Sequence, residues 1–134
     1  MARLHTPVAR RWSDLDLLGH VNNVTVLVYL EEARVALLRS LVGEVSWPPA
    51  VVVARHEVDY LRPLALRPEP VVVQTWVDRI GTTSYDIGYE VHDEGVVAVT
   101  ARSVMVCFDP ATQRKAPMPE VMREALAGLR DDER

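Results

Sequence analysis

Apolar side chains between residues 23 and 42 recur with the spacing of one helix face. Val26, Leu30, Ala33, Leu37 and Leu41 follow one another at steps of three or four residues, which places them on a single stripe of an α-helix. The alternating valines at the start of this segment favour a strand when taken alone, but good helix formers fill its second half. The pattern therefore predicts one helix over residues 23–42, and its many valines indicate burial on several faces.

Four later segments are rich in β-branched residues and are bounded by turn residues, as strands are. They cover residues 50–61, 71–80, 83–92 and 96–108. Short turns between most of them favour antiparallel pairing. A strand over residues 5–12 and a short terminal helix over residues 120–129 complete the pattern. We therefore predict one α+β domain, residues 1–134, in which a five-stranded antiparallel sheet wraps a long central helix.

The segment directly before the long helix, residues 11–23, is unusually polar. It contains two carboxylates, Asp14 and Asp16, one imidazole, His20, and the amides of Asn22 and Asn23. Either asparagine can cap the helix. The first N–H groups of a helix lack partners within it, and the positive end of the helix dipole lies there. This loop is therefore our candidate site for chemistry that develops negative charge.

Charge and hydrophobicity exclude several classes of function. The 134 residues carry a net charge of −4 without a basic cluster, so we expect no nucleic-acid partner. The apolar runs are far shorter than the roughly 20 residues that span a bilayer, so we expect no membrane insertion. Arg3, His5 and the pair Arg10-Arg11 interrupt any apolar leader at the N-terminus. The expected location is the cytoplasm.

The cysteine and histidine content gives no indication of a metal. One cysteine, Cys107, excludes an internal disulfide, and its apolar neighbours favour a buried packing role over a nucleophile. His5, His56 and His92 do not have the spacing of metal ligands. No metal site is predicted.

Two segments carry a resemblance to a known family. Residues 14–23, Asp-Leu-Asp-Leu-Leu-Gly-His-Val-Asn-Asn, and residues 29–34, Tyr-Leu-Glu-Glu-Ala-Arg, resemble the signature of hotdog-fold acyl-CoA thioesterases. The resemblance is greatest to the 4-hydroxybenzoyl-CoA thioesterase-like family. Segments 56–63, 79–84 and 108–109 follow in the order of that family.

The resemblance implies a hotdog fold and a homodimer or homotetramer, with two sheets joined edge to edge and active sites at the subunit interface. It implies an acyl-CoA substrate, with coenzyme A as part of the substrate and no separate cofactor. In this family, the carboxylate at the position of Asp16 attacks the thioester or activates water. The backbone N–H at the position of Asn23 polarises the thioester carbonyl.

The remaining site residues are assigned with the same resemblance. His20 either orients Asp16 or the water, or contacts the thioester, or only fixes the loop through hydrogen bonds. Gly19, Asn22 and Ser84 are expected on the substrate side. Relatives carry an aromatic residue or His where this chain has Asn23 and a Tyr where it has Val26, so substrate preference is not transferred.

Several alternatives stay open at this point. The same motif suits an acyl-carrier-protein thioesterase, and the fold suits a non-catalytic acyl-CoA binding module. A hotdog dehydratase is a third possibility, but its expected Asp and His context is not visible. Asp14 is expected to cap or to form an ion pair, Glu31 and Arg34 to pair, and the strand aromatics Trp76, Tyr85 and Tyr89 to pack. Four arginines are unranked candidates for phosphate contacts: Arg55, Arg62, Arg79 and Arg102.

Overall fold

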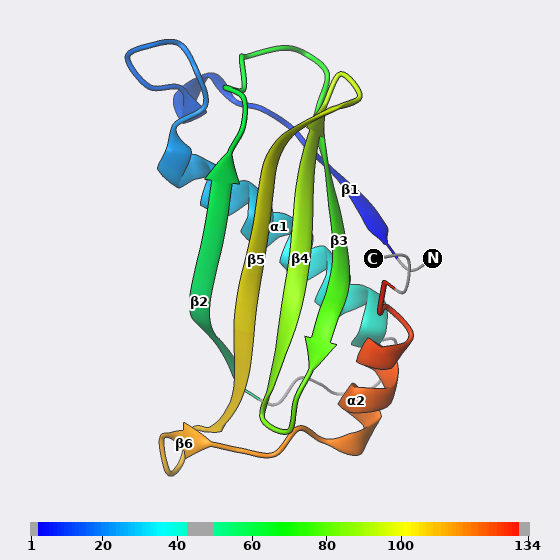
Figure 1. The fold of residues 1–134 in the computed structure, drawn as a ribbon. Helices are drawn as coiled ribbons and strands as arrows, with labels where there is room; N and C mark the ends of the chain where they lie inside the picture. The colour runs from blue at the N-terminus through cyan, green and yellow to red at the C-terminus, as the bar shows by residue number, and fades with distance from the viewer. Residues whose placement is uncertain (1–2, 43–49, 132–134) are drawn as a thin grey trace.

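A computed structural model describes residues 3–42 and 50–131. Its elements are β1 (Leu4–Val8), a 3-10 turn (Trp12–Asp14), α1 (Asn23–Val42), β2 (Val51–Tyr60), β3 (Val71–Ile80), β4 (Ser84–Asp93), β5 (Val96–Asp109), β6 (Arg114–Lys115) and α2 (Glu120–Ala127). The strands form an antiparallel sheet in the order β1-β3-β4-β5-β2 (Figure 1), and the short β6 pairs with β5. The predicted five-stranded sheet, long helix and short terminal helix are confirmed, and β6 is an addition.

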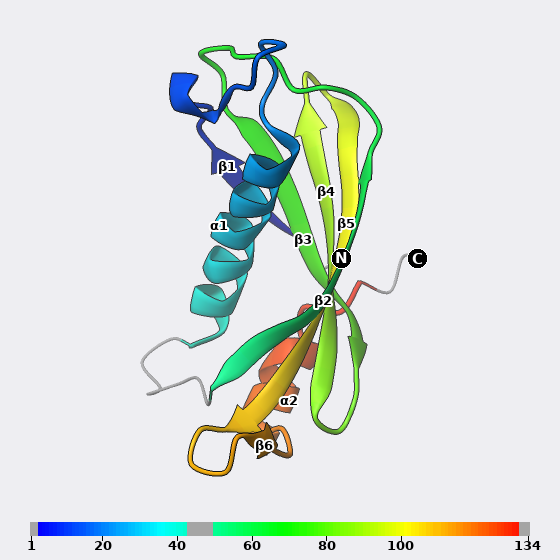
Figure 2. The same cartoon turned by 90° about the vertical axis from the view of Figure 1, so that its left-hand side faces the viewer.

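Helix α1 lies along one face of the curved sheet (Figure 2). The predicted apolar stripe faces the core, because Val26, Leu30, Ala33 and Leu37 are buried and Leu41 is partly buried. The opposite side of the helix is open in this chain: Val24 is 63% exposed, Val28 41% and Val35 40%. The expectation of burial on several faces is therefore wrong for the single chain, since its sheet covers one side of the helix.

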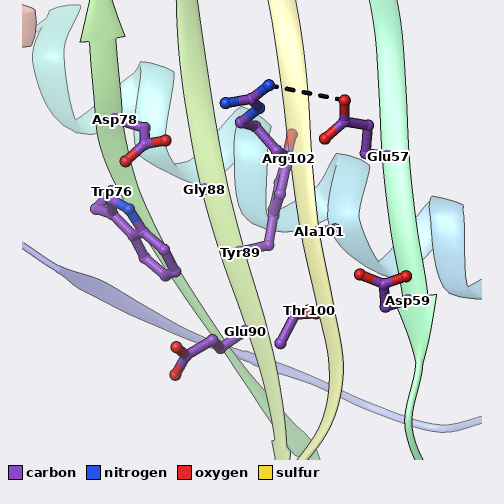
Figure 3. A pocket seen from close by; sticks show the side chains of 10 residues that line it. All are labelled: Glu57, Asp59, Trp76, Asp78, Gly88, Tyr89, Glu90, Thr100, Ala101 and Arg102. Atoms are coloured by element: carbon purple, nitrogen blue, oxygen red, sulfur yellow. Dashed lines mark ion pairs between the residues drawn. The ribbon is translucent and has the colours of Figure 1, made fainter. Parts of the chain in front are cut away.

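The strand aromatics pack as predicted, and the structure places them on both faces of the sheet. Tyr85 and Tyr89 are fully or almost fully buried within the core. Trp76 lies on the outer face over Gly88 (Figure 3). A methyl group on Gly88 would lie 2.3 Å from the indole ring of Trp76, so only a residue without a side chain admits this packing.

Two predicted elements end earlier than expected, because strand β3 sets their limits. The first strand stops at Val8, whose partner Val71 is the first residue of β3. The terminal helix stops at Ala127, and the chain then turns so that the Leu129 carbonyl accepts a 2.9 Å hydrogen bond from the Val77 N–H. In both places, hydrogen bonding to the neighbouring strand β3 outweighs the local strand or helix propensity of the segment.

Strand β2 forms one end of the sheet and is unusually exposed. It pairs with β5 along one side, and no described strand pairs with its other side. None of its residues is buried, and the apolar Val52, Val53 and Tyr60 are exposed. The N-terminal half of α1 crosses behind this strand (Figure 1). None of the helices in the described part of the chain combines the length and hydrophobicity that crossing a membrane requires.

Candidate active site

The loop before α1 is held in a compact turn by its own backbone. Leu15 and Val21 form an antiparallel bridge, and the Asp16 N–H donates to the His20 carbonyl at 2.8 Å. The Gly19 N–H closes the turn on the Asp16 carbonyl at 3.1 Å. Gly19 has a φ of 79°, a left-handed conformation that glycine adopts without steric cost. The loop is thus ordered without any contribution from the imidazole of His20.

Asp14 anchors the loop to the helix. Its carboxylate is buried and accepts hydrogen bonds from the Tyr29 hydroxyl at 2.5 Å and from the Arg11 N–H at 3.0 Å. Burial alone would raise the pKa of Asp14, but these bonds and the nearby Arg11 guanidinium outweigh it and hold the pKa below its usual value. Asp14 therefore has the structural role predicted for it.

Asp16 has a different environment. One carboxylate oxygen, Oδ1, accepts from the Leu18 N–H at 2.9 Å and from the His20 N–H at 3.3 Å. The other oxygen, Oδ2, has no hydrogen-bond partner among the residues that the structure describes. Asp16 is thus held in place through one oxygen while the second remains available to water or a substrate.

The start of α1 presents backbone donors that have no partner among the described residues. The Asn22 side chain is the cap: its Oδ1 accepts a 2.8 Å hydrogen bond from the Val24 N–H. Within the described ranges, the Asn23 N–H has no partner. The Tyr60 hydroxyl, on the last residue of β2, donates to the Asn23 carbonyl at 2.8 Å. The first turn of the helix is therefore fixed by the cap and by Tyr60, and the Asn23 N–H is one of its donors without a described partner.

These groups surround a cavity of about 290 Å³. Asp16, His20 and Asn23 line it together with the side chains of Tyr60 and Arg62. Its apolar lining consists of Val21, Val26, Leu61, Pro63, Leu64 and Val99. The imidazole of His20 forms no hydrogen bond with any described residue. A cavity with apolar walls and a few converging polar groups is typical of small-molecule sites.

The far wall of this cavity comes from the segment after β2. The Val21 N–H donates to the Leu64 carbonyl at 2.8 Å, and His20 forms a bridge with Ala65. The N–H groups of Leu61 and Arg62 both donate to the Ala98 carbonyl. The loop before α1 and the segment after β2, which are far apart in the sequence, are thereby joined across the site.

Ser84 lies elsewhere in the chain. It is the first residue of β4, which begins at the end of the sheet where α2 lies, whereas the Asp16 loop is at the other end (Figure 1). Its hydroxyl accepts a 2.8 Å hydrogen bond from the Arg79 guanidinium. Within one chain the structure therefore brings Asp16, His20 and Asn23 together, with Gly19 and Asn22 in the adjoining turn, but not Ser84.

A second cavity, of about 330 Å³, opens on the outer face of the sheet (Figure 3). Four carboxylates line it, those of Glu57, Asp59, Asp78 and Glu90. Arg102 is the basic residue on its wall, and it forms an ion pair of 3.7 Å with Glu57. Such a surface repels anionic ligands, so the cavity at Asp16 is the better candidate for a substrate that carries phosphates.

Two residues of the site could not be placed from the sequence. Tyr60 is expected from the sequence only to influence the shape of the pocket, and Arg62 is one of four unranked candidates for phosphate contacts. Their place at the cavity depends on the pairing of the segment 61–65 with the loop, for which the sequence carries no local signal. Cys107 is buried beside Met122, and burial raises the pKa of its thiol, which agrees with a packing role.

Comparisons with known proteins show the family of the chain. Residues 10–126 match the model of the thioesterase-like superfamily. The chain is 31% identical to the long-chain acyl-CoA thioesterase FadM of Escherichia coli over 130 residues, which covers 92% of this chain and 96% of that protein.

Two solved structures have the same architecture. A predicted thioesterase from Bacillus stearothermophilus superposes with a TM-score of 0.86 at 35% identity and covers 97% of this chain and 98% of that chain. A thioesterase from Thermus thermophilus, complexed with coenzyme A and Zn, superposes with a TM-score of 0.83 at 36% identity and covers 93% of this chain and 92% of that chain. The chain has the hotdog fold and belongs to the thioesterase-like superfamily.

Proposed function

We propose that this protein hydrolyses acyl-CoA thioesters to a free acid and coenzyme A. One observation carries the proposal: Asp16, whose carboxylate keeps one oxygen without a described partner, and Asn23, whose N–H has none among the described residues, line the same cavity. The similarity to a long-chain acyl-CoA thioesterase and to a thioesterase complexed with coenzyme A supports acyl-CoA as the substrate class.

The reaction needs a base or nucleophile and a donor for the developing oxyanion. Asp16 supplies a carboxylate that is held through Oδ1 and whose Oδ2 has no partner among the described residues. It removes a proton from the attacking water, or attacks the carbonyl carbon itself to form an anhydride that water then hydrolyses. In both cases the C–S bond breaks, the thiolate of coenzyme A leaves with the bonding electrons, and it takes up a proton. The Asn23 N–H donates to the oxyanion, a role that typically contributes about 10²–10³ in rate.

The neighbouring residues support this chemistry in different ways. His20 lines the cavity with a ring free of hydrogen bonds to described residues, which favours contact with the water or the thioester over a role in fixing the loop. Gly19 allows the turn that directs two N–H groups at Asp16 Oδ1. Asn22 caps the helix and so positions the Asn23 N–H.

The proposed active form is a homodimer or a homotetramer. Strand β2 is an exposed edge strand with several apolar residues, and its outer side pairs with no described strand, so it is a template for pairing with another strand. Pairing of β2 with β2 of a second copy would continue the sheet. Because antiparallel pairing reverses the second copy, Ser84 would then reach a substrate only from the partner subunit.

The test is thiol release from a panel of short-chain, long-chain and aromatic acyl-CoAs. The proposal is supported if the protein hydrolyses an acyl-CoA faster than it hydrolyses the same acyl group on an acyl carrier protein. The reverse preference would assign the carrier-protein reaction instead. Tight binding of acyl-CoA by calorimetry without thiol release from either carrier would overturn the enzymatic proposal in favour of a binding module.

A further inference from the structure

Tyr60 connects the edge strand β2 to the start of helix α1. It is the last residue of β2 and lies beside Val99 of β5 in the sheet. Its hydroxyl donates a 2.8 Å hydrogen bond to the carbonyl of Asn23, which lies 37 residues earlier in the chain. Tyr60 and Asn23 both line the cavity that contains Asp16. Partial burial raises the pKa of Tyr60, so its hydroxyl stays protonated and remains a donor at neutral pH.

The peptide group between Asn23 and Val24 is held at both of its ends. Its carbonyl accepts from Tyr60, and its N–H, that of Val24, donates to the Asn22 side chain at 2.8 Å. The peptide group before Asn23 is held through its carbonyl, because the Asn22 carbonyl accepts from the Val26 N–H at 3.1 Å. The N–H of this preceding group is the Asn23 N–H, the proposed oxyanion donor. Its direction is therefore set by hydrogen bonds to the peptide groups on both sides of the Asn23 Cα.

The hydrogen bond from Tyr60 differs from the other two because it comes from a distant part of the chain. The bonds to Asn22 join residues of the loop and the first helical turn, and such bonds can move together with the helix. The backbone that follows Tyr60 is fixed on the sheet, because the N–H groups of Leu61 and Arg62 donate to the Ala98 carbonyl at 2.9 and 3.0 Å. Tyr60 therefore sets the position of the helix start relative to the sheet.

We infer that Tyr60 is a positioning residue: its hydroxyl holds the start of α1 so that the Asn23 N–H points at the carbonyl oxygen of the substrate. This inference rests on the proposed function and deepens it. Loss of an oxyanion donor typically costs about 10²–10³ in rate. Tyr60→Phe keeps the donor but loosens it, so kcat for an acyl-CoA should fall by about tenfold, less than for loss of the donor itself. KM should stay unchanged, because the phenyl ring still fills the same wall of the cavity.

A ketone analogue of the substrate reports on the carbonyl directly. It is an acyl-CoA in which a methylene group replaces the sulfur, so it keeps the carbonyl oxygen but releases no thiol. A hydrogen bond to a carbonyl oxygen lowers its infrared stretching frequency. In the wild type this frequency should fall on binding, and in Tyr60→Phe saturated with the analogue it should return towards the value of the free ketone. A rise in KM with the bound frequency as in the wild type would show that Tyr60 contacts the substrate itself and would overturn the inference.

Tyr89→Phe is the matched control. It also removes a hydroxyl that donates a 2.8 Å hydrogen bond, in this case to Ser103. Tyr89 is buried in the core, outside the lining of the cavity at Asp16. Urea unfolding establishes that both variants are folded, and kcat and the ketone frequency of Tyr89→Phe should then equal those of the wild type. Equal losses of kcat in the two variants would reduce Tyr60 to a general stabilising residue and would overturn the inference.

The infrared measurement separates this inference from the proposed function, because it needs no turnover. If the wild-type protein releases no thiol from any acyl-CoA, the proposed function fails. A ketone frequency that falls on binding to the wild type and recovers in Tyr60→Phe would still support the positioning role. If the wild type does turn over but Tyr60→Phe matches it in kcat and in ketone frequency, the positioning role fails while the proposed function stands.

Discussion

Asp14 and Asp16 are separated by one residue, and the fold gives their carboxylates opposite environments. The Asp14 carboxylate is buried and accepts hydrogen bonds from Tyr29 and Arg11, whereas Asp16 lies beside a cavity and has one carboxylate oxygen without a partner among the described residues. The two carboxylates should therefore affect different properties when altered. Changes around Asp14 should act on stability, and changes at Asp16 on turnover.

The pair of Asp14 and Tyr29 should make stability depend on pH. The folded-state pKa of Asp14 lies below its unfolded value of about 3.9, so the folded state binds fewer protons in that range. Its stabilisation is present above that pH and is lost as the pH falls through the folded-state pKa.

The Tyr29→Phe variant isolates this effect. It should lower the free energy of unfolding by about 1–2 kcal/mol at pH 7, since it removes a buried donor to a charged group. Urea unfolding of the variant and the wild type should show the difference shrinking at pH 3. A difference of the same size at both pH values would contradict the assignment.

The sequence identified the residues of the motif because they are contiguous. Asp16, His20 and Asn23 stand in one short segment, and their backbone turn brings them together locally. Tyr60 and Arg62 join them only through the pairing of Val21 with Leu64. Which of the four candidate arginines form ion pairs likewise depends on the carboxylates that the strand register places beside them. That register cannot be predicted from the pattern of a single sequence.

The start of α1 is the element on which the proposed oxyanion donor depends. Asn22 and Asn23 are adjacent and of identical chemistry, but only the Asn22 side chain caps the helix in the described structure. Asn22→Ala should cost about 1 kcal/mol of stability, as loss of a cap does, and should lower kcat by displacing the Asn23 N–H. Asn23→Ala should change both little, because its proposed donor is the backbone.

The comparison is made by chemical unfolding and steady-state kinetics of the two alanine variants. A larger loss of kcat in Asn23→Ala than in Asn22→Ala would show that the Asn23 side chain, not its N–H, takes part in the reaction.

Hydrophobic periodicity predicts where the helices and strands lie more accurately than it predicts the residues at which they end. The stripe of α1 and the limits of β3 match the sequence pattern. The ends of β1 and α2 do not, because the pairing partners on β3 decide where those segments stop. The exposed valines of α1 are a second example. Hydrophobic periodicity predicts which positions are apolar, but it does not predict which part of the structure packs against them.

At the scale of the whole molecule, the exposed apolar surface of the single chain is the feature that bears on its assembly. The edge of β2 and the open side of α1 present Val52, Val53, Val24 and Val28 to solvent. We predict a dimer or tetramer at micromolar concentration, measured by light scattering coupled to size exclusion. Val52→Lys, which adds charge to the edge strand, should shift the protein towards monomer. A stable wild-type monomer with full activity would contradict a shared interface site.

The most direct test of the proposed chemistry is the turnover of Asp16→Asn. Asparagine keeps an Oδ1 that accepts the Leu18 and His20 N–H groups, so the loop and the unfolding midpoint should be preserved. The substitution removes the charge that acts as base or nucleophile, and kcat should fall by about 10²–10⁴-fold. Wild-type turnover that disappears in a folded Asp16→Asn protein is the predicted result, and an unchanged rate would contradict the assignment of Asp16.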